Sequence, residues 1–313
     1  MSRRYLCGAL VGVLATAGAL TAAASAAPAS SQVQAKPSMM RTFNGKPSKP
    51  VRPRRTNNLY YHGGVGGIGV ETAPKVYLVL WGSQWNSNDP SGEASKLQSF
   101  FSHVGGSSWL NSVTQYCQGV ANGTITCGTS GQHAGNQSGI YVTTWADNAS
   151  AAPSHPTQSQ LAAEAVRAAG QSGNTSSTTN NTVQYVVATA TGNNASGFGT
   201  QYCAWHSSTS SQYGNIAYTN LPYITDAGAS CGSNFVNPGS AGATDGITIV
   251  EGHELAETIT DQFPNGGWLD GSGAENGDKC AWSAATSNQS MGGSSFPVQP
   301  LWSNASSSCV LSY

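Results

Sequence analysis

The segment Asp245–Lys279, DGITIVEGHELAETITDQFPNGGWLDGSGAENGDK, gathers acidic side chains in a chain of which only 9% is charged. It holds eight of the chain's 14 acidic residues, which are Asp245, Glu251, Glu254, Glu257, Asp261, Asp270, Glu275 and Asp278. His253 lies among them. We expect a helix to begin near Asp245 and to pack on a sheet formed by earlier parts of the chain. The acids around one histidine point to a site on that helix.

His253 and Glu257 are four residues apart, so a helix places their side chains on one face, about one turn apart. This spacing suits two ligands of one metal ion. Glu254 holds the position at which the glutamate of an H-E-x-x-H motif polarises a metal-bound water. The sequence here is H-E-x-x-E, with Glu257 in place of the second histidine. Zinc accepts carboxylate oxygen as well as imidazole nitrogen, so the pattern still predicts a metal helix.

A third ligand has to come from beyond the helix. Asp261 follows His253 by eight residues, which is about 12 Å along a helix axis and too far for a shared ion. The proline and the two glycines of segment 264–267 end the helix and allow the chain to reverse. Glu275 is therefore the predicted third ligand, with Asp278 as its rival or its hydrogen-bonding neighbour.

Two other interpretations of the same segment stay open. In the first, Glu254 and Glu257 form a solvated helix face and His253 packs without a chemical role. In the second, the carboxylates hold a structural calcium ion, because calcium prefers hard oxygen ligands.

The first 27 residues have the pattern of a secretory signal peptide. Arg3 and Arg4 precede an apolar core over Leu10–Leu20, and small residues follow at Ala23–Ala27. No later apolar run has the length of a membrane span, so we expect a secreted protein without one.

Residues 28–55 are rich in lysine, arginine and proline and contain no acid. Such a composition cannot bury a core, and it predicts a disordered pro-segment or arm. The sequence Arg52-Pro-Arg-Arg55 suggests a processing site behind a basic arm that shields an acidic body; an arm that associates with the cell wall is the alternative. The acidic body lacks the cations that nucleic-acid binding requires.

Six cysteines follow the predicted signal peptide, and an even number in an exported chain predicts three disulfides. Of the fifteen possible connectivities, we prefer the sequential one because it closes the shortest loops. It pairs Cys117 with Cys127, Cys203 with Cys231 and Cys280 with Cys309.

Apolar runs at Val76–Trp81 and Val183–Ala190 read as buried strands. Helical patterns alternate with them, and shorter strands are expected at Tyr202–His206 and Ile216–Thr219. These features predict a single disulfide-stabilised α/β domain over residues 56–313, a central mixed sheet flanked by helices with a zincin-like metal helix. Gly252, inside that helix, suggests a close approach by the sheet or by a ligand.

Several blocks of the chain resemble the Exordium, or phosphate-induced protein, family of plants and its bacterial relatives. They are YHGG at 61–64, VQYVVATATGNNASGFGTQYCAWH at 183–206, DGITIVEGHELAET at 245–258 and GAENGDKC at 273–280. The resemblance implies a secreted protein of the wall or apoplast, and it brings no established enzyme activity. His62 and His206 fall in these blocks. Each histidine is a candidate for a metal ligand from a distant part of the chain or for a proton donor opposite Glu254. The alternative for both is a hydrogen-bonded structural histidine.

Together these patterns favour a secreted metal-dependent hydrolase, peptidase-like, that acts on an extracellular peptide or cell-wall substrate. Zinc is the expected ion, with calcium as the alternative. The predicted metal ligands are His253, Glu257, Glu275 and Asp278, and the predicted catalytic residues are Glu254 and His206. A non-catalytic wall or matrix protein with a calcium or carboxylate cluster is the competing interpretation. Recognition of a wall polysaccharide by tryptophan and tyrosine side chains is a third.

Overall fold

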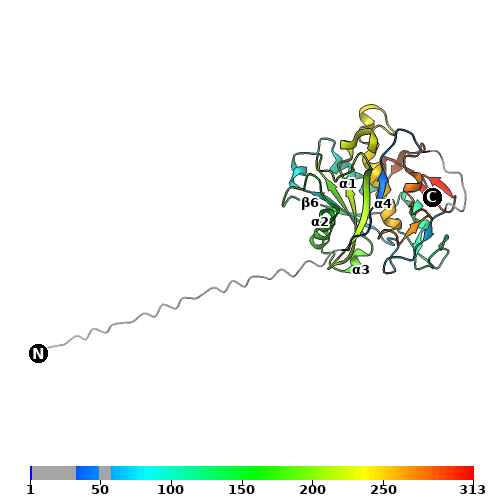
Figure 1. Ribbon diagram of the computed structural model, residues 1–313, viewed down its shortest axis with the longest axis horizontal. Helices are drawn as coiled ribbons and strands as arrows, with labels where there is room; N and C mark the ends of the chain where they lie inside the picture. Colours follow the sequence, from blue (N-terminus) through cyan, green and yellow to red (C-terminus); the bar gives the residue numbers. More distant parts are fainter. Residues whose placement is uncertain (2–32, 49–57) are drawn as a thin grey trace. The chain divides into compact units, whose positions relative to one another are not determined.

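A six-stranded mixed sheet carries the fold in the computed structural model, which describes residues 33–48 and 58–313 besides Met1 (Figure 1). Its strands are β1 (Ser38–Arg41), β3 (Lys75–Trp81), β6 (Tyr141–Asp147), β7 (Val183–Thr189), β8 (Tyr202–Ser211) and β9 (Gly214–Leu221). They lie in the order β1-β8-β9-β7-β3-β6. Strands β6, β3, β7 and β9 are parallel, whereas β8 runs antiparallel to β9 and β1 runs antiparallel to β8. The predicted central mixed sheet is therefore confirmed.

The two apolar runs form the middle of the sheet, as predicted. Every residue of β7 is buried, which suits β-branched side chains covered on both faces. Alternate residues face opposite sides. Val186 joins the core that contains α1 and α4, and Val187 joins the core that contains α2.

Helices cover both faces of the sheet (Figure 1). They are α1 (Glu93–Val104), α2 (Gln158–Gln171), α3 (Ser177–Asn180) and α4 (Asp245–Thr260). A capping box begins α2, where the Thr157 side chain accepts from the Gln160 N–H. A 3₁₀ helix, η3, spans Leu110–Gln115.

Strands β8 and β9 are longer than the sequence predicted. The chain continues β8 through Ser211 and turns at residues 212–213. Ser207, Ser208 and Thr209 are buried strand residues, whereas Ser210 is exposed. Ser207, for example, donates to the Ala35 carbonyl at 3.0 Å. Polar composition hid this strand because it lacks the run of apolar side chains that marks a buried strand in the sequence.

Part of the basic segment 28–55 is ordered, which corrects the prediction of disorder. Ser38–Arg41 form β1 on the outer edge of β8, and Met40 is fully buried. Pairing with a sheet edge needs only main-chain groups, so the composition of the segment could not reveal it. The predicted signal peptide, residues 1–27, and the Arg52–Arg55 sequence lie outside the described residues.

Three disulfides join Cys117 to Cys127, Cys203 to Cys231 and Cys280 to Cys309, the sequential pattern that the sequence favoured. Such bridges are compatible with an extracellular location. Among the helices in the described ranges, none has the length and apolarity that crossing a membrane requires.

Smaller elements complete the chain. The two-stranded sheets pair β2 (Tyr60–Tyr61) with β10 (Trp268–Leu269), β4 (Cys117–Gln118) with β5 (Gln132–His133), β11 (Ser287–Met291) with β12 (Ser294–Val298), and β13 (Leu301–Ser303) with β14 (Ser308–Val310). The other 3₁₀ helices are η2 (Ser83–Asn86), η4 (Ile224–Cys231), η5 (Gly239–Gly242) and η6 (Asp278–Cys280).

Candidate metal centre

Helix α4 is buried along its whole length, from Asp245 to Thr260. Glu251, Glu254 and Glu257 are 0% exposed, so these glutamates do not form a solvated helix face. Burial of an ionised carboxylate costs several kcal/mol unless it is paired or neutralised. The arrangement around α4 therefore has to supply protons, counter-charges or a cation.

The His253 imidazole is oriented by Gln299. Its Nδ1 lies 3.2 Å from Gln299 Oε1, while Gln299 Nε2 donates to the Gly277 carbonyl at 2.8 Å. The second bond fixes the amide so that its oxygen faces the ring. Nδ1 is then assigned the hydrogen and Nε2 the lone pair, which is the state in which a histidine binds a metal.

The His253 Nε2 atom faces two carboxylates. Nε2 lies 3.0 Å from Glu257 Oε1 and 3.8 Å from Asp278 Oδ1. Tetrahedral ligands of a zinc ion, bound at about 2.0–2.2 Å, lie roughly 3.4 Å from one another. The spacing of these three atoms thus fits the coordination sphere of one small cation.

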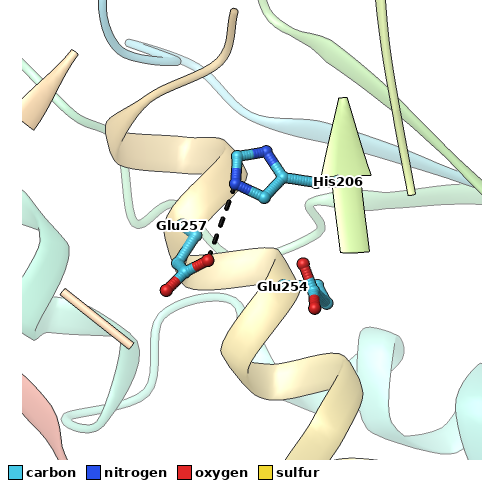
Figure 2. Close-up of side chains that lie close together, drawn as sticks. All are labelled: His206, Glu254 and Glu257. Carbon is cyan, nitrogen blue, oxygen red and sulfur yellow. Dashed lines mark ion pairs between the residues drawn. The ribbon is translucent and has the colours of Figure 1, made fainter. Parts of the chain in front are cut away.

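A second group adjoins the first. His206 projects from β8 toward α4, which carries Glu254 and Glu257 (Figure 2). His206 Nε2 lies 3.1 Å from Glu275 Oε2 and 3.6 Å from Glu257 Oε2. One ligand atom each from His206, Glu254 and Glu257 lies within 4.8 Å of the others. The two oxygens of Glu257 therefore face different histidines, and this carboxylate links the two groups.

Several buried polar atoms of the cluster have no hydrogen-bond partner within the described part of the chain. They are His206 Nδ1, His253 Nε2, both oxygens of Glu254, Glu257 Oε2 and Glu275 Oε1. The 3.0 Å contact of His253 Nε2 with Glu257 is consequently a close approach without hydrogen-bond geometry. Buried polar atoms rarely go unsatisfied in proteins. A bound cation and its water would satisfy these atoms, so the donor set fits a metal ion.

The acids of the cluster resist ionisation. Burial raises the pKa of Glu254 to about 8, although the charge of His253 opposes the shift. Burial, with help from the charge of Glu257, raises the pKa of Asp278 to about 7. Glu257 is the exception, since the two histidines outweigh its burial and lower its pKa. Glu257 is thus the carboxylate most firmly held as an anion.

The histidines show the opposite balance. Burial alone would lower the pKa of His206, but the Glu275 and Glu257 carboxylates raise it well above the ordinary value. Burial likewise lowers the pKa of His253, and Glu257 more than compensates, raising it to about 10. Protons or a metal ion must therefore supply positive charge here.

The chain reverses after α4, as the sequence predicted. The Asp261 carboxylate holds the turn by accepting from the main-chain N–H groups of residues 265–267. It is occupied in this way and does not join the cluster. The reversal brings Glu275 to His206 and Asp278 to His253. The two rivals for third ligand thus approach different histidines.

Three further residues contribute to the site, and the sequence analysis did not predict them. Gln299 orients His253 from 46 positions away, a relation that no local pattern encodes. Glu71 is fully buried, accepts from Gln184 Nε2 at 2.8 Å, and has its pKa raised by burial to about 8. Gly277 packs so tightly that a Cβ there would lie 2.9 Å from His253 Nδ1.

Two expectations about other positions need correction or restriction. The close approach at Gly252 comes from an aromatic side chain, not from the sheet or a ligand. A Cβ there would lie 3.2 Å from Trp109 Cη2. His62 is not brought into either group of ligand atoms; its Nδ1 contacts the Tyr60 carbonyl at 3.0 Å and its ring stacks on Tyr60.

Comparison of the chain with protein-family models, with curated proteins and with solved structures finds no match. The resemblance to the Exordium family therefore rests on the sequence blocks quoted above, and the site has to be interpreted from its own geometry.

Proposed function

We propose that this chain is a secreted, single-domain hydrolase with a zincin-like metal helix, and that it cleaves peptide or amide bonds outside the cell. The observation that carries the proposal is the convergence of His253 Nε2 and Glu257 Oε1, both buried, with Asp278 Oδ1, whose side chain is 27% exposed. The unsatisfied atoms around them support a cation at that point.

His253, Glu257 and Asp278 would hold the ion. Glu275 would not bind it directly but would contact His206. Zinc suits a set that mixes imidazole nitrogen with carboxylate oxygen. Bound there, it would polarise the substrate carbonyl and lower the pKa of a water molecule.

Glu254 takes the role of general base. Both of its oxygens lack a protein partner, and its pKa of about 8 lies close to neutral pH. A general base works best when its pKa is near the operating pH. His206 faces it from β8 and is kept protonated by Glu275 and Glu257. In this proposal it would donate a hydrogen bond to the oxygen on which negative charge develops.

Replacement of Glu254 by glutamine tests the proposal. We expect Glu254→Gln to keep its metal and its fold while hydrolysis of an internally quenched peptide library falls by about 10²- to 10⁴-fold. His253→Ala should lose both metal and activity. The metal content is measured by mass spectrometry of the purified protein. Equal hydrolysis by Glu254→Gln and wild type would remove Glu254 from the chemistry.

A structural calcium site in a non-catalytic matrix protein is the second candidate. The number of carboxylates in the cluster favours it, because calcium takes six to eight oxygen ligands. The imidazole nitrogens of His206 and His253 disfavour calcium, because calcium binds oxygen ligands. Calcium binding measured by calorimetry, with zinc as competitor, separates the two: tighter calcium binding and no hydrolysis would favour the matrix protein.

A further inference from the structure

The outer edge of β8 is covered by a segment from the N-terminal part of the chain. Ser38 pairs with His206 and Met40 with Ala204 in antiparallel register. The pairing extends beyond β1, since the Ala35 N–H donates to the Ser208 carbonyl at 2.9 Å. Residues 33–41 thus follow β8 past the histidine of the site.

This segment also lies against the candidate metal centre. Residues paired across strands share a face of the sheet, so Ser38 and Met40 lie on the His206 side. Strand β1, blue in Figure 1, contacts α4. Residues 36–38 and Glu275 line one cavity of about 190 Å³. An extended chain in this position therefore lies beside His206 and Glu275 of the cluster.

Main-chain hydrogen bonds rather than side chains hold the segment. Among residues 33–41, all of which the structure describes, Met40 alone is buried, and Met39 is 41% exposed. Any extended peptide can reproduce main-chain pairing with a sheet edge, and few side-chain pockets restrict its sequence. The edge is therefore suited to a polypeptide of varied sequence.

We infer that the outer edge of β8 is the substrate-binding site, which takes an extended polypeptide as an added antiparallel strand, and that residues 33–41 occupy this site as a built-in inhibitor. The inference rests on the proposed function and specifies its substrate class. Tethering gives the built-in strand an effective concentration in the millimolar range. A free peptide at micromolar concentration then binds only when the built-in strand is weakened.

Substitution within β1 weakens the built-in strand and leaves β8 unchanged. Met40→Asp places a charge in a buried apolar position, which opposes docking of the strand. Met39→Asp makes the same charge change at the neighbouring exposed position and is the matched control. Ser38→Pro, which removes a main-chain N–H from the strand, is the second variant in case Met40→Asp does not fold.

The probe is a fluorescein-labelled peptide with the sequence of residues 33–46, followed by anisotropy. All variants carry Glu254→Gln in the full chain, so binding is measured without cleavage. We expect Met40→Asp to bind the peptide at least about tenfold more tightly than wild type or Met39→Asp. A peptide N-methylated at alternate residues, which cannot pair, should not bind. Hydrogen exchange of residues 33–41 reports whether the built-in strand is released.

The outcomes separate this inference from the proposed function. Absence of peptide binding when the built-in strand is released would overturn the inference, as would binding of the N-methylated peptide with equal affinity. A β1 strand that stays paired in both variants would overturn it too, because β1 would then be a permanent strand of the sheet. Peptide binding without hydrolysis by the Glu254-containing protein would preserve the inference and refute the hydrolase.

Discussion

At the scale of single residues, the cluster depends on side chains that hold others in place. Gln299 is the main example: its carbonyl oxygen faces His253 Nδ1, and its amide nitrogen is fixed by the carbonyls of Gly277 and Pro300. The imidazole lone pair at Nε2 is directed at Glu257 and Asp278 for this reason. A buried polar residue outside the acidic segment thus decides which nitrogen is free to bind a metal.

Replacing Gln299 by leucine should loosen the metal without abolishing the fold. Loss of such an orienting partner costs about 10- to 100-fold in metal affinity, because the ring can rotate or change tautomer. The affinity is measured by competition with a chromophoric zinc chelator. Gln289→Leu is the control, since the Gln289 side chain, among the described residues, donates hydrogen bonds only to its neighbours Ser287 and Asn288. Equal zinc affinities of the two variants would show that Gln299 plays no orienting role.

The sequence predicted some residues of the site and missed others for identifiable reasons. His253 and Glu257 could be paired because a helix fixes the relation between positions four apart. Glu275 and Asp278 could both be proposed as the third metal ligand. The sequence could not decide between them, since their positions depend on the path of a turn. Gln299 comes from a separate part of the chain, and a single glutamine carries no pattern.

At the scale of elements, α1 places a buried glutamate against η4. Glu93, in the first turn of α1, accepts from the Ile224 N–H at 2.8 Å. Burial raises the pKa of Glu93 to about 8, although the hydrogen bonds from Ile224 and Thr225 oppose the shift. The carboxyl of Glu93 is thus protonated in the folded chain at pH values where it is ionised in the unfolded chain.

This difference makes stability depend on pH through Glu93. Between about pH 4.5 and 8 the folded state holds a proton that the unfolded state releases, so the free energy of unfolding falls as pH rises. The full contribution is present below pH 4.5 and is lost above about pH 8. One such group adds a slope of up to about 1.4 kcal/mol per pH unit. Urea unfolding at several pH values should show a shallower fall for Glu93→Gln. Parallel curves for the two proteins would contradict the assignment.

Elements differed in how well the sequence predicted them. Strands β3 and β7 could be predicted from their continuous apolar runs. Such runs occur because both faces of these strands are covered. The second half of β8 does not, since buried serines and a threonine replace the apolar side chains there. Strand β1 lies in a basic segment and is held by main-chain pairing. Amino-acid composition gives no sign of such pairing.

At the scale of the whole molecule, the charge distribution and the disulfides explain how such a site can be tolerated. The chain concentrates its acids on and after α4, where burial and mutual repulsion destabilise them. Three disulfides offset part of this cost; bridges that close loops of such lengths contribute roughly 2–4 kcal/mol each. One of them, Cys203–Cys231, anchors β8 three residues before His206.

The overall architecture followed from the sequence more readily than the arrangement around the site. Alternation of apolar strands with amphipathic helices was enough to predict a mixed sheet flanked by helices, and an even cysteine count was enough to predict three bridges. The sequence did not reveal that the N-terminal segment returns to the edge of β8 beside the candidate metal centre, because this contact joins His206 to a residue 168 positions earlier in the chain, Ser38.

The position of a bound metal ion tests the central claim most directly. Crystals of the purified protein grown with zinc, measured on both sides of the zinc absorption edge, locate the ion by anomalous scattering. The account predicts one strong peak about 2.0–2.2 Å from His253 Nε2, Glu257 Oε1 and Asp278 Oδ1. A structure in which these three atoms surround no anomalous peak, and the carboxylates instead share protons with the histidines, would contradict it.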